Sequence, residues 1–205
     1  MFASRVCVLD TESTGLPRDE HAAPIDVGAV ILDTDGAEVA SFSTLVRPAV
    51  WGDAANDAAR IHGITLAMVS DAPNPAEVGE DLAEWLHVNG CRWVTSYSVE
   101  FDREMMARIG FRRSGWAPCV MRRALAIMGP AGALRPADPT HPRYDSGSPW
   151  LFPPLSPRPV GDRRGFSACE FFGVDPEMPA HRALSDAVTA ARVLKKIVSR
   201  SCGTP

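Results

Sequence analysis

Two carboxylates one residue apart end an apolar run near the start of the chain. Residues 6–9 have the pattern of a buried strand, and the run continues into Asp10 and Glu12. Because side chains alternate between the two faces of a strand, both carboxylates point to the same side. Two like charges side by side need a cation or solvent between them. The pattern fits a metal-dependent phosphoryl-transfer enzyme, a non-catalytic module that binds nucleic acid or protein, or a strand that ends in solvated acids.

Two aspartates farther along the chain could join this pair. Asp102 follows Phe101 in a segment that must pack on the sheet, and Asp186 lies among the small and apolar residues of segment 183–188. Taken singly, Asp102 could cap a helix and Asp186 could face water. Buried carboxylates need partners, however, and neither aspartate has an obvious lysine near it in the sequence. Mg²⁺ or Mn²⁺, which prefer oxygen ligands, would meet that need.

A histidine precedes the last aspartate at an informative distance. His181 lies five residues before Asp186, an offset of about 140° on a continuous helix, so the two side chains would not share a face. If the helix begins after His181, as Pro179 permits, the imidazole can turn toward the carboxylates. Histidine is a natural acceptor of a proton from water near neutral pH. A surface or capping role is the alternative for this side chain.

The strands that would position these groups follow from the hydrophobic pattern. After the first strand, the β-rich runs 24–32 and 37–46 flank an Asp-Gly turn, which is typical of a hairpin. Residues 92–97 indicate a fourth strand. A short fifth strand is expected near Cys119, running into a helix that reaches Met128.

Helical periodicity accounts for most of the remaining chain. Segment 53–67 predicts a short helix, a stop at Gly63 and a second helix start at Thr65. From apolar spacing and end signals, further helices are expected over 75–88, 100–109, 165–172 and 183–199. Segment 129–164 is rich in proline and lacks periodicity, which indicates an insertion, a substrate-covering loop or a partly disordered stretch. The order of strands and helices indicates an α/β layer architecture.

Composition excludes several classes of protein. The 205 residues are 45% hydrophobic and 22% charged, which is typical of a globular chain with one good-sized core. No apolar run approaches the roughly 18 residues of a membrane span, and no signal segment begins the sequence, so we expect a cytoplasmic protein without a membrane partner. The 5 cysteines are scattered and form no C-x-x-C pair, which argues against a disulfide framework or a zinc site.

The net charge of −4 is distributed unevenly along the chain. Residues 1–101 carry 5 Lys or Arg against 16 Asp or Glu, whereas residues 102–205 carry 16 against 9. Lys195 and Lys196 are the lysines of the sequence, so arginine supplies nearly all of the positive charge. Guanidinium groups suit bidentate contact with phosphate, although a solvated face has the same composition. The overall acidity argues against a protein that coats nucleic acid nonspecifically.

The ordered motifs resemble the DEDDh 3′→5′ exonuclease family, which includes the epsilon proofreading subunit of bacterial DNA polymerase, RNase T and oligoribonuclease. Four segments carry the resemblance: residues 10–16, His-Gly-Ile-Thr at residues 62–65, Phe101 with Asp102, and His181 with Asp186. Together they span almost the whole chain, from residue 5 to about residue 198. A lone D-x-E pair would be weak evidence, but four ordered segments at these spacings are specific.

The resemblance implies a fold and a mechanism. The fold would be an RNase H-like α/β domain over residues 1–200, with a central mixed five-stranded sheet flanked by helices and the Pro-rich segment as an insertion or loop. Two Mg²⁺ or Mn²⁺ ions would be held by four carboxylates, with His181 as the general base. The four implied ligands are Asp10, Glu12, Asp102 and Asp186.

The resemblance also implies a substrate and contacts to its 3′-terminal nucleotide. The implied contacts are Thr14, Gly15, Leu16, His62, Ile64 and Phe101, the last of which is equally well explained as a core aromatic residue. The substrate would be single-stranded or 3′-frayed nucleic acid, with DNA favoured, although trimming of RNA or oligoribonucleotides uses the same ligands. A polymerase or another replication or repair protein is a candidate partner. The oligomeric state stays open, and a homodimer is compatible with the family. Ser98 stands where the family often has asparagine, and we expect it to affect substrate preference and rate.

Overall fold

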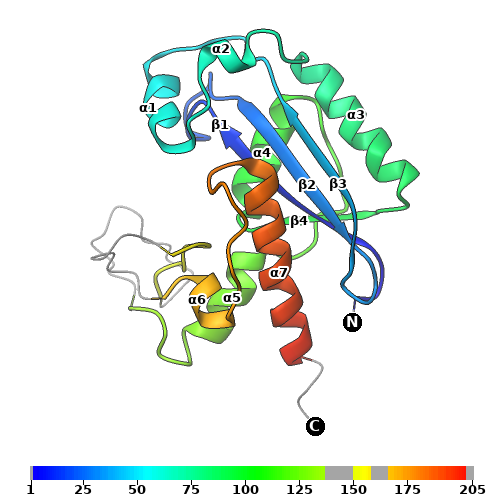
Figure 1. Cartoon of the computed structure of the whole chain (residues 1–205), viewed down its shortest axis with the longest axis vertical. Coiled ribbons are helices and arrows are strands. Elements are labelled where there is room, and N and C mark those ends of the chain that lie inside the picture. Colours follow the sequence, from blue (N-terminus) through cyan, green and yellow to red (C-terminus); the bar gives the residue numbers. More distant parts are fainter. Residues whose placement is uncertain (1, 137–149, 158–165, 202–205) are drawn as a thin grey trace.

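A four-stranded mixed sheet forms the centre of the structure. The structure, a computed structural model, describes residues 2–136, 150–157 and 166–201. The strands are β1 (Val6–Ser13), β2 (Pro24–Leu32), β3 (Glu38–Leu45) and β4 (Trp93–Ser96), in the order β3-β2-β1-β4. β2 is antiparallel to both of its neighbours, whereas β4 is parallel to β1 (Figure 1). The predicted hairpin is confirmed.

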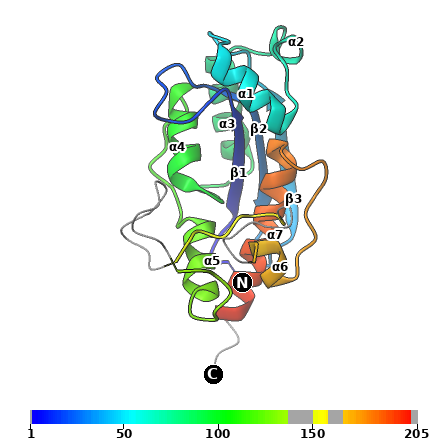
Figure 2. The same cartoon turned by 90° about the vertical axis from the view of Figure 1, so that its left-hand side faces the viewer.

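Helices cover both faces of this sheet. α3 (Pro75–Val88) and α4 (Val99–Arg108) pack on one face, and α5 (Val120–Met128), α6 (Ala168–Phe172) and α7 (Ala183–Ser201) pack on the other. Figure 2 shows β1 between α4 and α7. Two further helices, α1 (Asp53–His62) and α2 (Leu66–Val69), lie near the end of the sheet at which β1 ends. None of the helices in the described ranges has the length and hydrophobicity needed to cross a membrane.

The alternation of β1 assigns its side chains to the two layers. Val6 and Val8 are buried against α5 and α7, whereas Cys7 and Leu9 are buried against α3 and α4. Fully burying such a side chain contributes about 1.5–3 kcal/mol, so a slip of one residue would be costly. The same period of two carries the Asp10 side chain onto the face that α7 covers.

The expectation of a five-stranded sheet is wrong, because the described residues form four strands. Just before the segment expected to be the fifth strand, Trp116 makes a single bridge to Val94 of β4. Two backbone hydrogen bonds hold Trp116 beside β4. The Val94 N–H donates to the Gly115 carbonyl at 2.9 Å, and the Ala117 N–H donates to the Val94 carbonyl at 2.8 Å. Pro118 has no N–H group to extend the ladder, and α5 begins two residues later, as expected for the helix that reaches Met128.

The Pro-rich segment packs onto the protein where it is described. Leu134 is buried in the core between the sheet and α5–α7. The hydroxyl of Tyr97 donates to the backbone carbonyl of Pro153 at 2.8 Å, and both groups are buried. Residues 137–149 and 158–165 lie outside the described residues, so the expectation of an insertion, a substrate-covering loop or a partly disordered stretch stays a prediction.

Candidate active site

The carboxylates of β1 meet the start of α7. Glu12, His181 and Asp186 each offer one metal-ligand atom, and these atoms lie within 4.8 Å of one another. Asp10 lies close enough to Glu12 and Asp186 for both charges to raise its pKa. The first strand and the last helix thus bring together four of the residues that the sequence singled out.

A glycine in β2 allows α7 to come this close to the sheet. Gly28 lies opposite Asp10 in the β1–β2 pair. A Cβ atom at this position would overlap the backbone of Ala183 and Leu184. The first turn of α7 therefore occupies the space that a side chain at position 28 would fill. Since Asp186 lies in that turn, the close approach carries its carboxylate to the strand.

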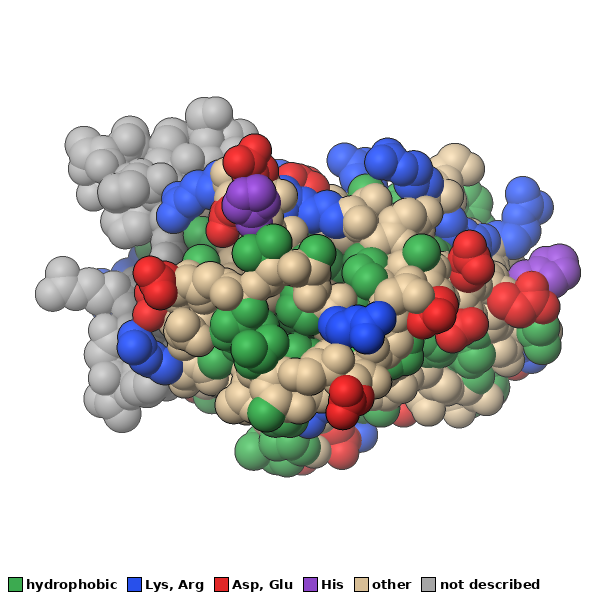
Figure 3. Space-filling model, turned by 90° about the horizontal axis from the view of Figure 1, so that it is seen from above, with side chains coloured by type: hydrophobic (Ala, Val, Ile, Leu, Met, Phe, Trp, Pro, Cys, Tyr) green, Lys and Arg blue, Asp and Glu red, His purple; other side chains and the backbone are tan. Residues whose placement is uncertain are grey.

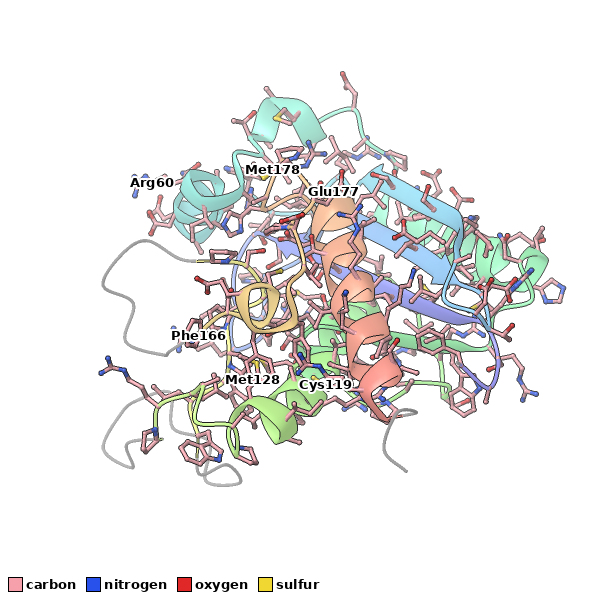
Figure 4. All side chains as sticks on the ribbon, turned by 60° about the horizontal axis from the view of Figure 1, so that its bottom comes forward. Arg60, Cys119, Met128, Phe166, Glu177 and Met178 are labelled. Atoms are coloured by element: carbon pink, nitrogen blue, oxygen red, sulfur yellow. The ribbon has the colours of Figure 1, made fainter. Side chains whose placement is uncertain are left out.

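The turn before α7 directs the histidine toward the carboxylates. α7 begins two residues after His181, at the residue that the sequence predicted. The imidazole therefore does not have to follow the direction of a helix face. The φ angle of His181 is 59°, in the left-handed region that residues other than glycine adopt when their surroundings hold them there. The loop that leads to it is tied to α7, because Arg192 donates to the Glu177 carboxylate at 2.6 Å. Figure 4 shows Glu177 and Met178 beside the start of that helix.

A buried carboxylate that the sequence analysis missed organises this turn. Asp26, in β2, is 1% exposed, and its Oδ2 accepts hydrogen bonds from Arg182 Nε at 2.7 Å and from the Ala183 N–H at 3.2 Å. Its Oδ1 is buried and has no hydrogen-bond partner among the described residues. The contacts fix the two residues that follow His181. An acid within an otherwise apolar strand is the sequence signal that would have revealed it.

Asp102 reaches the site from α4, on the other layer. Its side chain lies in the first turn of α4 and is 2% exposed. β4 ends opposite Leu9, so α4 can pass beside the last residues of β1. The hydroxyl of Thr11 donates to Asp102 Oδ1 at 2.8 Å and orients the carboxylate. Thr11 was missed because the sequence presents it as a mere spacer between the two acids of β1.

Burial and mutual repulsion raise the pKa values of these acids. Burial is the largest cause in each case, and it raises the pKa of Glu12 to about 8 and that of Asp102 to about 7. The pKa of Asp10 lies well above its ordinary value, because the charges of Asp102 and Asp186 add to the effect of burial. Burial also raises the pKa of Asp186, while the neighbouring His181 opposes the rise. Bound protons or cations are therefore needed to neutralise this charge.

The donor set fits hard divalent cations. Among the described residues, Arg182 pairs with Asp26, but none of the four predicted ligands forms an ion pair with a lysine or arginine. Carboxylate oxygens beside one imidazole are the ligands that Mg²⁺ and Mn²⁺ accept, and cysteine thiols are not part of the cluster. The uncompensated negative charge is what such cations would neutralise.

The expected substrate contacts after β1 form one loop at the rim of the site. The backbone N–H of Thr14 donates to the Ala23 carbonyl, and the Thr14 hydroxyl accepts from the Ala23 N–H, both at 2.9 Å. Gly15 is partly buried within the loop, and Leu16 is 50% exposed. Phe101, also partly buried, lies at the start of α4. An apolar side chain and a backbone turn are thereby presented beside the carboxylates.

One arginine ties this loop to α4. The Arg108 guanidinium donates to the backbone carbonyls of Pro17, Asp19 and Ala22 at 2.5, 2.7 and 2.6 Å, and to the Glu104 carboxylate at 3.1 Å. A planar group with five donors can serve several acceptors at once. No sequence pattern marks this contact, because it joins positions 86 to 91 residues apart.

The two residues expected from the His-Gly-Ile-Thr segment have different surroundings. His62 is 8% exposed, and its Nδ1 accepts from the Ile64 N–H at 3.0 Å, which leaves the proton of the neutral ring on Nε2. That Nε2 is buried without a hydrogen-bond partner among the described residues. Burial lowers the pKa of His62, and the charge of His181 lowers it further. Ile64 is instead fully buried with Ile25 and Val69 in a small core.

A comparison with protein-family models gives one match over just more than half of the chain. The model is described as "Exonuclease" and matches residues 7–113, which run from β1 past the end of α4. No match was found among the curated proteins.

Solved structures of several nucleases share the fold. Exonuclease I of E. coli, in complex with a 5cy-dT13 oligonucleotide, has a TM-score of 0.67 and 15% identity over 97% of this chain, which spans 41% of that one. Exonuclease X, in complex with 5′ overhanging duplex DNA, has a TM-score of 0.57 and 24% identity, covering 97% of this chain and 94% of that one. A 3′-exonuclease that recognises a histone mRNA stem-loop has a TM-score of 0.68 and 14% identity, covering 98% and 67%. At these identities the likeness shows a shared fold.

Proposed function

We propose, since the chain belongs to the exonuclease family, that it is a divalent-metal-dependent 3′→5′ exonuclease acting as one domain over residues 1–200. It hydrolyses phosphodiester bonds from the 3′ end of nucleic acid, with DNA favoured, and releases nucleoside 5′-monophosphates. The observation that carries this proposal is the approach of Glu12, His181 and Asp186 to within 4.8 Å of one another.

In this proposal the four buried or partly buried carboxylates hold two Mg²⁺ or Mn²⁺ ions. When bound, such a pair of ions activates the attacking water and stabilises the charge that develops on the leaving 3′ oxygen. The ligands are Asp10, Glu12, Asp102 and Asp186. Their raised pKa values support the assignment. In a site that holds cations, the carboxylates repel one another when the cations are absent, and this repulsion raises their pKa values.

His181 accepts the proton of the attacking water. The water oxygen bonds to the terminal phosphorus while the bond between phosphorus and the 3′ oxygen of the preceding nucleotide breaks. The exposed imidazole lies beside Glu12 and Asp186 and can pass the proton on to solvent. The contacts of Asp26 with Arg182 and Ala183 support this role, because they fix the chain next to the histidine.

The 3′-terminal nucleotide lies between the loop after β1 and α1. Thr14 and Gly15 present their backbone near the sugar, and Leu16 offers an exposed apolar face to the base. His62 donates from its unpaired Nε2 on the other side, while Ile64 supports that segment from the core. Figure 3 looks onto the end of the protein near α1 and α2 and shows hydrophobic side chains between charged ones. Apolar contact with bases tolerates any sequence, as the trimming of any strand requires.

A strand-shortening assay tests the proposed function. A 5′-labelled oligonucleotide with an unpaired 3′ end is incubated with the protein and Mg²⁺ or Mn²⁺, and the products are separated by length. The expected result is a ladder that shortens from the 3′ end and disappears in the Asp10→Ala variant. No shortening with either metal, or equal loss of strand with the variant, would contradict the proposal.

Matched DNA and RNA strands compared in the same assay test the substrate preference. Faster loss of the DNA strand supports the proposal, whereas faster loss of RNA would favour RNA or oligoribonucleotide trimming, which depends on contacts to the 2′-hydroxyl. Tight, metal-independent binding of a strand that stays intact would instead indicate a module that binds nucleic-acid ends. All four implied ligands are present in the sequence, which favours cutting.

The cellular context belongs to the same proposal. A cytoplasmic location is supported by Cys7, Cys91, Cys119 and Cys169, which are free and buried. A polymerase or another replication or repair partner, and a homodimer, stay predictions.

A further inference from the structure

We infer that the nucleic acid has a second contact surface along the β4 edge, beyond the carboxylates. Two neighbouring grooves follow this edge, with volumes of about 410 Å³ and about 540 Å³. Residues 112–115 line the first groove and residues 116–119 line the second. The grooves therefore follow one another along a single stretch of eight residues, which spans at most roughly 26 Å.

Positive charge dominates both grooves. Their six arginines, which we call the arginine track, are Arg92, Arg103, Arg112, Arg113, Arg122 and Arg123. Glu100 is the acid that lines the same grooves, and it is 3.1 Å from Arg122.

Four guanidinium groups of the arginine track have no partner among the described residues. Arg92, Arg103, Arg112 and Arg123 form no ion pair or side-chain hydrogen bond with any described residue. Three of the four are exposed, and Arg123 is partly buried. In a chain whose net charge is −4, an uncompensated row of this kind attracts an external polyanion.

Two tryptophans lie among these arginines. Trp93 is 45% exposed and lines the first groove, and Trp116 is partly buried and lines the second. Guanidinium groups bind phosphates, and aromatic rings stack on unpaired bases. Interleaved arginine and tryptophan side chains therefore favour a single strand of nucleic acid over an acidic peptide, which has no bases to stack.

The arginine track begins beside the candidate active site. Arg103 follows Asp102 directly in α4, and it lines the second groove together with Arg122 and Arg123 of α5. Figure 2 shows α4 and α5 one below the other along the same side of the protein. A strand whose 3′ end lies at the carboxylates can thus continue over α4 into the track. The inference rests on the proposed function, because the bound strand is the one trimmed at that end.

Strand binding without metal tests the arginine track. Affinity for a long 5′-labelled oligodeoxynucleotide is measured by fluorescence anisotropy in EDTA, over a series of salt concentrations. Arg112→Gln/Arg123→Gln removes one charge from each groove, and the control Arg47→Gln/Lys196→Gln removes two exposed charges elsewhere. We expect the first variant to lower the slope of log affinity against log salt by about 1.4 and to bind about 20-fold more weakly at about 0.1 M salt. The control should keep the wild-type slope.

Substitutions of Trp93 test the stacking contact separately from charge. Trp93→Leu should weaken strand binding by at least about five-fold, whereas Trp93→Phe keeps an aromatic face and should restore most of it. Equal affinity of the Leu and Phe variants would contradict stacking on this residue.

Hydrolysis of a mononucleotide aryl ester separates this inference from the proposed function. Thymidine 5′-p-nitrophenyl phosphate can occupy the carboxylates without reaching the arginine track, so wild type and the Arg112→Gln/Arg123→Gln variant should cleave it equally. Absence of strand and ester cleavage by wild type would contradict the proposed function, while the anisotropy comparison would still decide the track. Equal loss of binding in variant and control would overturn the track. Competition by polyglutamate as effective as by DNA of equal charge would do the same.

Discussion

His181 is the residue whose chemical role can be separated most directly from substrate binding. It is exposed and lies outside α7, so its replacement removes little buried surface. His181→Asn should reduce kcat on a labelled strand by about 10²- to 10⁴-fold, because the acceptor of the water proton is lost. Strand affinity, measured by anisotropy in EDTA, should change little. A variant that loses affinity and keeps kcat would contradict the role as general base.

The raised pKa values of the carboxylates predict how stability depends on pH. In the folded protein the pKa is about 8 for Glu12 and about 7 for Asp102, so the folded state binds more protons than the unfolded state above about pH 4. The stability that these protons contribute is lost as pH rises through the folded pKa values. The melting temperature in EDTA should therefore fall between about pH 5 and pH 8.

Two additions sharpen the pH experiment. Glu12→Gln should flatten the dependence, because it removes the group whose pKa is about 8. Mn²⁺ should raise the melting temperature most at the high-pH end, where it competes with fewer bound protons. A wild-type melting temperature that stays constant in EDTA across this range would contradict the raised pKa values of these carboxylates in the folded state.

At the scale of elements, the approach of α7 to β2 decides whether the site assembles. Gly28→Ala places a Cβ against the backbone of the first turn of α7, and overpacking of this kind costs about 1–3 kcal/mol. We expect a lower free energy of unfolding and a lower kcat, because Asp186 is moved away from Asp10. Urea unfolding and the strand assay measure the two effects.

Gly52→Ala is the matched control for this substitution. A Cβ at Gly52 meets no atom within 4 Å, and its φ of −117° suits any residue. The control should therefore keep wild-type stability and rate. If Gly28→Ala behaved in the same way, the close approach of α7 would not be what positions Asp186.

The loop that bears Leu16 depends on α4 through Arg108. Arg108→Ala removes three hydrogen bonds to backbone carbonyls, so the loop should lose its fixed position beside the site. We expect a rise of about ten-fold or more in KM for the strand, equivalent to about 1.4 kcal/mol, with a smaller change in kcat. Glu104→Gln leaves those three bonds in place and is the control. Equal KM values in all three proteins would contradict the role of Arg108.

Local patterns predict most elements of this fold, and long-range packing explains what they miss. Helix α3 and strand β2 were predicted with their observed bounds, because capping, hydrophobic spacing and turn residues all act locally. The predicted fifth strand does not form, because the backbone pairing with β4 ends before Pro118, which has no N–H group to donate. Gly28 and Asp26 position the site through their contacts with the start of α7. Local patterns could not reveal these contacts, because they join parts of the chain that are far apart in the sequence.

At the scale of the whole molecule, the two halves of the sequence, which differ in charge, contribute differently to the site and to the β4 edge. The acidic half contributes Asp10, Glu12 and Asp26 to the site, and the basic half contributes most of the arginines along the β4 edge. The sequence could predict the imbalance and the ligand set. It could not place the arginines, because the grooves join Arg92 with residues of α4, of α5 and of the segment between those helices.

The most direct test of the central claim is an anomalous-scattering map from crystals grown with Mn²⁺ and a nucleoside 5′-monophosphate. We expect two manganese peaks among the carboxylates, with the nucleotide phosphate beside His181. The ligands should be Asp10, Glu12, Asp102 and Asp186. A map at saturating Mn²⁺ with no manganese peak between β1, α4 and α7 would contradict the claim that these four carboxylates form a two-metal site.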